Sequence, residues 1–200
     1  MKENIRSIIT LTLITLIAGA LLGYVYELTK EPIAAKTLEE KLNAYHKVFP
    51  EASDFKEDPG VNLDASRAVL DASGYSKETV DECLGAYDAS GNKLGYVLSV
   101  TTSEGYGGDI KISMGVGGDG VLKGIEILSI SETAGLGMKA DTDEFKDQFT
   151  NRNVSKFSYT KTGATADYEI DAISGATITT NAMVNAVNAG IEYAGKVGGQ

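Results

Sequence analysis

Three segments in the second half of the chain combine glycine with hydroxyl or carboxyl side chains that could bind a ligand. They are residues 104–109 (EGYGGD), 132–137 (ETAGLG) and 171–177 (DAISGAT). Glycine permits positive φ and lets a planar ring or a phosphate approach the backbone, which leaves amide groups free to donate. These residue types therefore predict a site for a phosphate-bearing ligand.

The third segment precedes a predicted helix whose N-terminus is rich in hydroxyl groups. These belong to Ser174, Thr177, Thr179 and Thr180. Unpaired amides and the helix dipole favour an anion at such a position. Plain helix capping by Thr179 or Thr180 is the alternative interpretation.

Metal-based and thiol-based chemistry is largely excluded by the count of ligands. The chain has one cysteine, Cys83, and one histidine, His46. It cannot by itself build a disulfide, a Cys₄ iron–sulfur site, a CxxCH haem attachment or a His/Cys zinc site. His46 falls in a predicted amphipathic helix, where we expect a packing or surface role. Electron transfer by this protein would therefore need an organic cofactor.

The charge balance argues against a nucleic-acid partner. The 200 residues include 28 Asp and Glu against 18 Lys and Arg, which gives a formal net charge of −10. An acidic chain without a basic cluster repels a phosphate backbone.

Residues 115–120 (GVGGDG) match the G-x-G-x-x-G pattern of dinucleotide-binding proteins. That pattern requires a helix directly after the glycines, whereas a β-branched strand follows here. We expect a hairpin turn instead.

An uncharged, Ile- and Leu-rich stretch covers residues 7–26. About 20 residues at about 1.5 Å per residue span a bilayer core of roughly 30 Å, so the stretch predicts a transmembrane helix. Thr10, Thr12 and Thr15 can return their hydroxyls to carbonyls of the preceding turn. A cleaved signal peptide is the alternative, but its apolar region would be unusually long and no A-x-A site follows. We expect the N-terminus inside and the rest outside the cytoplasm.

Hydrophobic periodicity beyond residue 26 predicts an α+β fold with one antiparallel sheet and helices packed on it. Pro32 is expected in the first turn of an amphipathic helix that ends at Pro50, and residues 51–80 are expected to be a polar, turn-rich lead-in. The remaining expected elements are four strands (82–88, 93–102, 109–116, 121–130), a short helix (142–149), a strand (168–173) and a closing helix (179–193).

Residues 171–177 resemble the D-x-x-S/T-G-A-T acceptor signature of proteins that carry FMN covalently. Together with residues 132–137, residues 106–108 and the N-terminal helix running into residues 29–33, the chain resembles the G subunit of the Rnf electron-transport complex. The resemblance implies an FMN phosphoester on Thr177. Further cofactor-binding residues would be Asp171, Ser174, Gly175, Ala176, Glu132, Thr133, Gly135, Leu136, Gly137 and Thr179.

The sequence departs from the family pattern at one position and contains a second candidate acceptor. The family commonly has proline where Ala134 stands, so the 132–137 loop is expected to be less rigid. Residues 162–165 (TGAT) are a second acceptor candidate, but Tyr159 stands where the acid would be, and no helical pattern follows directly. Thr177 is the preferred site.

The resemblance also implies a role, partners and a location. The protein would be a non-catalytic, electron-carrying component of an ion-translocating ferredoxin:NAD⁺ oxidoreductase in a bacterial cell membrane, with the flavin domain on the extracytoplasmic side. Its partners would be the other proteins of the complex and a flavin transferase of the ApbE type. The implied domains are residues 1–26 (tail and membrane helix), 27–80 (amphipathic helix and lead-in) and 81–200 (FMN-binding domain).

Two other functions remain open at this level. The same domain occurs in the NqrC component of the sodium-pumping NADH:quinone reductase and in other extracytosolic flavin reductase chains. An anchored binding module, in which the S-G-A-T residues only cap a helix, belongs to a different class.

Overall fold

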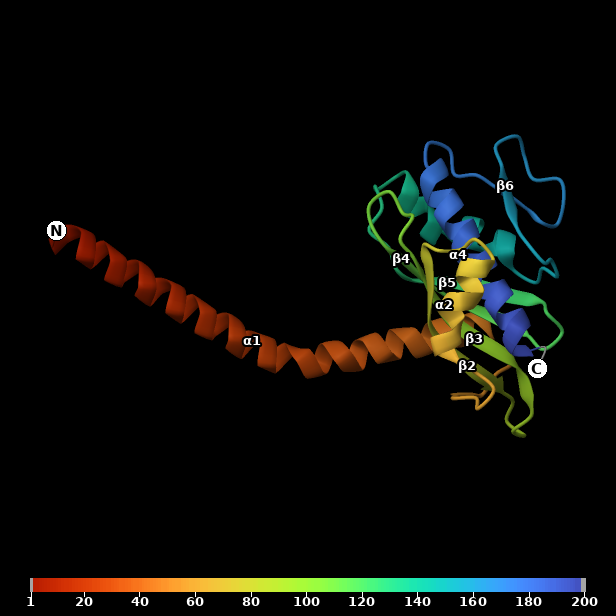
Figure 1. Cartoon of the computed structure of the whole chain (residues 1–200), viewed down its shortest axis with the longest axis horizontal. Coiled ribbons are helices and arrows are strands. Elements are labelled where there is room, and N and C mark those ends of the chain that lie inside the picture. Colours follow the sequence, from red (N-terminus) through yellow and green to blue (C-terminus); the bar gives the residue numbers. More distant parts are fainter. Residues whose placement is uncertain (1, 199–200) are drawn as a thin grey trace. The chain divides into compact units, whose positions relative to one another are not determined.

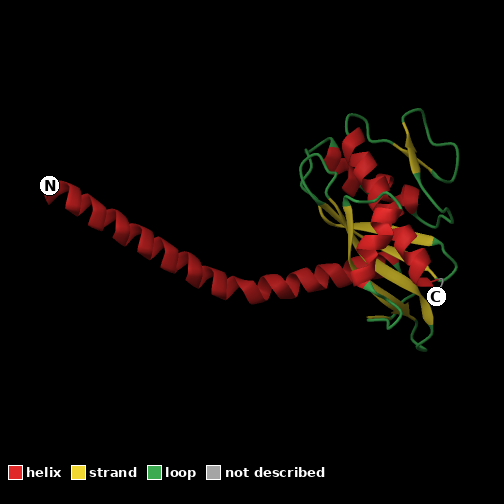
Figure 2. Cartoon of the chain, in the orientation of Figure 1, coloured by secondary structure: helices red, strands yellow, loops and turns green. Residues whose placement is uncertain are grey.

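The structure, a computed structural model, describes residues 2–198, with side chains from residue 5 onward. Two compact units meet in the sequence between Lys41 and Leu42. Figure 1 shows the elements in chain order, and Figure 2 shows that helices cover the sheet of the second unit.

The N-terminal helix α1 runs from Lys2 to Val48 and is long and apolar enough to cross a membrane. The hydroxyls of Thr10, Thr12 and Thr15 donate to carbonyls four residues earlier, at 2.9, 2.9 and 3.1 Å, as predicted. The prediction that a separate helix begins near Pro32 is wrong, because Pro32 lies inside α1. Its fixed φ is compatible with a helix, and its missing donor removes one bond from a ladder that continues on both sides.

The expectation of an irregular segment over residues 51–80 is also wrong. The chain forms strand β1 (Asp54–Lys56) and helix α2 (Leu63–Ala72) before β2 begins. The carboxamide of Asn62 accepts a hydrogen bond from the Ala65 amide at 3.2 Å and caps α2. β1 has only three residues and is stabilised by pairing with β2, so its own sequence carries no periodic signal.

A five-stranded antiparallel sheet forms the centre of the second unit, in the order β1-β2-β3-β4-β5. The predicted meander and the predicted α+β class are confirmed, with β1 as an additional edge strand. Residues 118–120 form the hairpin turn between β4 and β5, with Gly120 at φ +80°, so the glycine-rich segment 115–120 ends a strand and makes a turn, as expected. The four longer strands are β2 (Glu78–Tyr87), β3 (Lys93–Thr102), β4 (Ile110–Gly117) and β5 (Leu122–Ser129).

The two faces of the sheet are covered differently. Helices α2 and α4 lie on one face (Figure 1), where Leu98, Ile112 and Met114 are completely buried. The opposite face carries a smaller cluster that includes Tyr45 and Phe49.

The C-terminal part carries the residues with candidate chemistry. The predicted short helix is present as a run of turns, η1 (Gly137–Asp141), α3 (Asp143–Lys146) and η2 (Asp147–Phe149). The predicted strand at 168–173 is present as β7 (Glu169–Asp171). It pairs in parallel with β6 (Ser158–Thr160), a strand that the sequence pattern did not reveal. Helix α4 (Thr177–Gly198) begins two residues earlier than expected.

Asn188 on α4 connects the helix to the segment before β6. Its side chain is 2% exposed, accepts a hydrogen bond from the Phe157 amide at 2.7 Å and donates to the Phe157 carbonyl at 2.9 Å. We expect Asn188→Ala to lower the free energy of unfolding by about 2–4 kcal/mol, because two buried backbone groups lose their partners.

Urea denaturation of the full chain in detergent measures this effect. The control is Asn181→Ala at a partly exposed position of the same helix, which should change stability by less than about 0.5 kcal/mol. Equal effects of the two substitutions would contradict the role of Asn188.

Candidate functional site

Thr180 connects the first turn of α4 to the segment before it. The completely buried Thr180 hydroxyl donates to the Ala176 carbonyl and accepts from the Ile173 amide, each at 3.0 Å. Gly175 has φ +77°, which closes the turn before the helix. The helix begins at Thr177, so Thr179 and Thr180 lie within its first turn, and the interpretation of either as the N-cap is wrong.

Thr177 lies on the wall of a cavity of about 610 Å³. This volume is within the range of small-molecule and cofactor sites, about 300–1,000 Å³. Three segments that are distant in sequence contribute to it: the loop before β4, the loop after β5 and the start of α4. Its lining residues are Tyr106, Glu132, Thr133, Leu136, Gly137, Gly175, Ala176, Thr177, Ile178 and Thr179.

Three large apolar side chains around the cavity are exposed to solvent. Tyr106 is 72% exposed, Ile178 54% and Leu136 43%. Large apolar side chains gathered at a concave site usually indicate a surface that a ligand or partner covers. Helix α4 adds backbone amides of its first turn, which have no partners within the helix. The cavity thus combines apolar side chains with the N-terminal turn of a helix and a hydroxyl on Thr177.

Glu132 links two of the three segments. Its side chain is 9% exposed, and Oε1 accepts hydrogen bonds from the amides of Tyr106 at 2.7 Å and Gly107 at 3.3 Å. A Cβ on Gly137 would lie 2.6 Å from Glu132 Oε2 and 2.7 Å from Thr179 Oγ1. Only glycine fits between these two side chains, so Gly137 sets the close approach of the loop to α4.

The structure brings most of the predicted site residues together and places three of them elsewhere. Asp171 and Ser174 line a neighbouring cavity of about 310 Å³, and Gly135 lies in a turn at φ +76°. Their part in binding a cofactor stays a prediction. Ile178 lines the main cavity but is not among the residues predicted from the sequence. The signal that could have identified it is an apolar residue directly after the acceptor threonine.

Asp171 contacts the loop that contains the second acceptor candidate. Its Oδ1 accepts a hydrogen bond from the Ala164 amide at 2.6 Å, and its own amide donates to Gln148 Oε1 at 2.6 Å. Thr165 donates through its amide and hydroxyl to Glu169, at 2.8 and 3.0 Å. Thr165 is therefore an exposed loop residue rather than part of a helix N-terminus.

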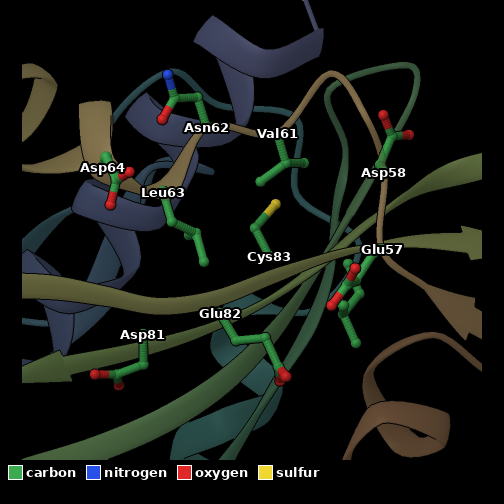
Figure 3. A pocket seen from close by; sticks show the side chains of 10 residues that line it. Glu57, Asp58, Val61, Asn62, Leu63, Asp64, Asp81, Glu82 and Cys83 are labelled. Carbon is green, nitrogen blue, oxygen red and sulfur yellow. The ribbon is translucent and has the colours of Figure 1, made fainter.

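A third cavity, of about 400 Å³, is acidic and contains the cysteine (Figure 3). Side chains of Glu57, Asp58, Asp64 and Asp81 surround it, and Cys83 points toward Val61 and Leu63. Within the described part of the chain, no three His, Cys, Asp or Glu side chains are arranged to bind a metal ion.

Burial raises the pKa of the Cys83 thiol to about 12. At pH 8 only about one thiol in ten thousand would be ionised, and the thiolate is the reactive form. We therefore expect iodoacetamide at pH 8 to leave the native chain unmodified and to alkylate it fully in denaturant, as read from the intact mass. Complete alkylation of the folded protein would show that Cys83 is accessible.

Comparison with known proteins assigns the class of this site. The FMN-binding domain family matches residues 105–192, a range that includes every residue lining the main cavity. The crystal structure of Shewanella oneidensis NqrC has a TM-score of 0.50 and 18% sequence identity, and the match covers 59% of this chain and 61% of that one. This likeness shows a shared fold, and the family match identifies residues 105–192 as an FMN-binding domain.

Full-length relatives give the particular family. The chain is 33% identical over 195 residues to the G subunit of the ion-translocating oxidoreductase complex of Methanosarcina acetivorans, covering 96% of this chain and 95% of the relative. It is 31% identical over 186 residues to the G subunit of the Na⁺-translocating ferredoxin:NAD⁺ oxidoreductase complex of Acetobacterium woodii, covering 91% and 87%. The chain belongs to this family of ion-translocating oxidoreductase G subunits, which confirms the resemblance seen in the sequence.

The contact of Gly137 with Glu132 and Thr179 leads to a direct test of the cavity wall. We expect Gly137→Ala to destabilise the protein by about 1–3 kcal/mol, because the methyl group overlaps both side chains. Chemical denaturation in detergent measures the change.

Gly195→Ala on α4 is the matched control. Nothing lies within 4 Å of the added Cβ, so this substitution should stabilise the helix by about 0.5–1 kcal/mol. If Gly137→Ala were as well tolerated as Gly195→Ala, the wall could not be as closely packed as the structure indicates.

Proposed function

We propose that this chain is the electron-carrying flavoprotein of a membrane-bound ion-translocating ferredoxin:NAD⁺ oxidoreductase, with FMN attached through a phosphoester to Thr177. The observation that carries the proposal is the position of Thr177. Its hydroxyl belongs to the first turn of α4, on the wall of a cavity lined by exposed apolar side chains.

The residues present fit an FMN group. The first-turn amides and the helix dipole suit a phosphate next to Thr177. Tyr106, Leu136 and Ile178 supply apolar surface for a planar ring, and burial of that surface favours binding. The isoalloxazine supplies the redox chemistry, because it accepts two electrons and can release them one at a time.

The positions around Thr177 also suit attachment by an enzyme. Ser174 and Gly175 are exposed, so a flavin transferase of the ApbE type could approach the threonine from this side. Asp171 ties the neighbouring loop to the acceptor segment and would keep it extended for the transferase.

The relatives support membership in a complex of several proteins. Curated relatives are named as components of Na⁺-translocating and proton-translocating ferredoxin:NAD⁺ oxidoreductase complexes. We place residues 1–26 in the membrane with the N-terminus inside, and the flavin domain, with residues 81–200 as its main part, outside the cytoplasm. The β1 and α2 segment of residues 27–80 packs with that domain, because β1 pairs with β2. A helix in the membrane would keep the flavin near integral partner proteins.

A component of a sodium-pumping NADH:quinone reductase is the second candidate, favoured by the fold of NqrC. Sequence identity supports the first candidate, because the identity to the relative from Methanosarcina acetivorans is 33% over 96% of the chain, against 18% over 59% for NqrC.

Replacement of the acceptor hydroxyl tests the proposal directly. The full chain is produced together with a flavin transferase, and covalent flavin is detected as a fluorescent band in a denaturing gel and by intact mass. We expect Thr177→Val to abolish the band, because valine has a similar shape but no oxygen to form the ester.

The matched control is Thr165→Val in the other G-A-T triplet, which should keep the full signal. A band of undiminished intensity in Thr177→Val, or its loss in Thr165→Val alone, would contradict the assignment.

A further inference from the structure

We propose that Glu132 is a positioning residue of the flavin site that also lowers the reduction potential of the flavin through its negative charge. This inference rests on the proposed function. It concerns a side chain that touches two segments of the site at once and does not depend on which protein complex the chain joins.

Glu132 is at the centre of the contacts that shape the cavity. One carboxylate oxygen accepts hydrogen bonds from the amides of Tyr106 and Gly107, at 2.7 and 3.3 Å. The other oxygen lies against Gly137. The 105–108 loop is thereby attached to the loop after β5.

Close backbone contacts next to Glu132 require glycine at positions 105 and 107. An added Cβ on Gly105 would lie 3.0 Å from Glu132 Oε1 and 2.1 Å from the Gly108 carbonyl. A Cβ on Gly107 would lie 2.1 Å from the Ser131 carbonyl and 3.3 Å from Glu132 Cα. Close packing on both sides of Glu132 fixes the backbone of Tyr106, whose exposed side chain lines the cavity.

Within the described residues, no cationic side chain lies close enough to Glu132 to form a salt bridge with it. The salt bridges among residues 5–198, with N···O distances of at most 4.0 Å, are formed by other carboxylates. The side chain is 9% exposed, so solvent screens it incompletely. A carboxylate on the cavity wall repels the electrons added to the ring, so the oxidised flavin is favoured and the potential is lowered.

The test uses the full-length protein in detergent, carrying covalent flavin from co-expression with the transferase. Glu132→Gln keeps an oxygen that can accept both amide hydrogen bonds but removes the charge. We expect its two-electron midpoint potential to be more positive, by about a tenfold change in the reduction equilibrium, which corresponds to about 30 mV.

Glu169→Gln is the matched control. The Glu169 carboxylate likewise accepts hydrogen bonds from two backbone amides, those of Thr165 and Ala166, but it does not line the cavity. Its substitution should leave the midpoint potential unchanged.

A fluorescence measurement tests positioning separately. The chain contains no tryptophan, so Tyr106→Trp introduces a single reporter whose emission a neighbouring flavin quenches. We expect quenching to persist when Glu132→Gln is added, and emission to increase at least twofold when Glu132→Ala is added, because alanine releases the Tyr106 loop.

The outcomes separate this inference from the proposed function. A wild-type protein without covalent flavin would overturn both. Covalent flavin in the wild type, together with equal potentials in Glu132→Gln and Glu169→Gln, would overturn the electrostatic role alone. Unchanged quenching in the Glu132→Ala background would overturn the positioning role.

Discussion

The close packing of helix α4 on the central sheet is the contact on which the rest of the site depends. A Cβ on Gly190 would lie 2.1 Å from the sulfur of Met114, so glycine allows the helix backbone to approach β4 directly. Ala182, Ala186 and Ala189 are buried along the same helix. Because the helix lies so close to the sheet, its N-terminal turn is held at one end of the strands, and Thr177 is held with it.

The topology of the sheet brings the two glycine-rich loops to this same end. β4 begins where β5 ends, since Lys111 pairs with Ser129 in the antiparallel register. The loop before β4 and the loop after β5 are therefore neighbours, although about 25 residues separate Tyr106 from Glu132, and the Glu132 carboxylate joins them. A structural hydrogen-bond acceptor and an unbalanced charge thus coincide in one side chain at the proposed flavin site.

Glu132 differs from most other carboxylates of this acidic chain in its burial and in its partners. Most carboxylates that pair with a cation do so on the surface, as Asp167 does with Arg152 at 2.7 Å, and such pairs contribute little to stability. Glu132 instead is largely buried and accepts backbone hydrogen bonds. The apolar side chains of Tyr106 and Ile178 remain exposed around it, which is unfavourable in water unless a ligand covers them.

The sequence by itself determined the class of fold, the membrane-length helix and the four long strands, because periodicity and turn residues are local signals. It also marked the segments around Glu132 and Thr177 as candidates for the site, and the structure places both at one cavity. It did not reveal β1, α2 or β6, and it placed a helix boundary at Pro32 that does not exist. Only the tertiary structure decided that Ile178 lines the main cavity and that Asp171 lines the adjacent, smaller one. It also decided that Thr180 lies inside the helix and hydrogen-bonds to the preceding turn, and is not the N-cap. Pairing of a three-residue strand and the direction of a side chain depend on contacts distant in sequence, which no local pattern encodes.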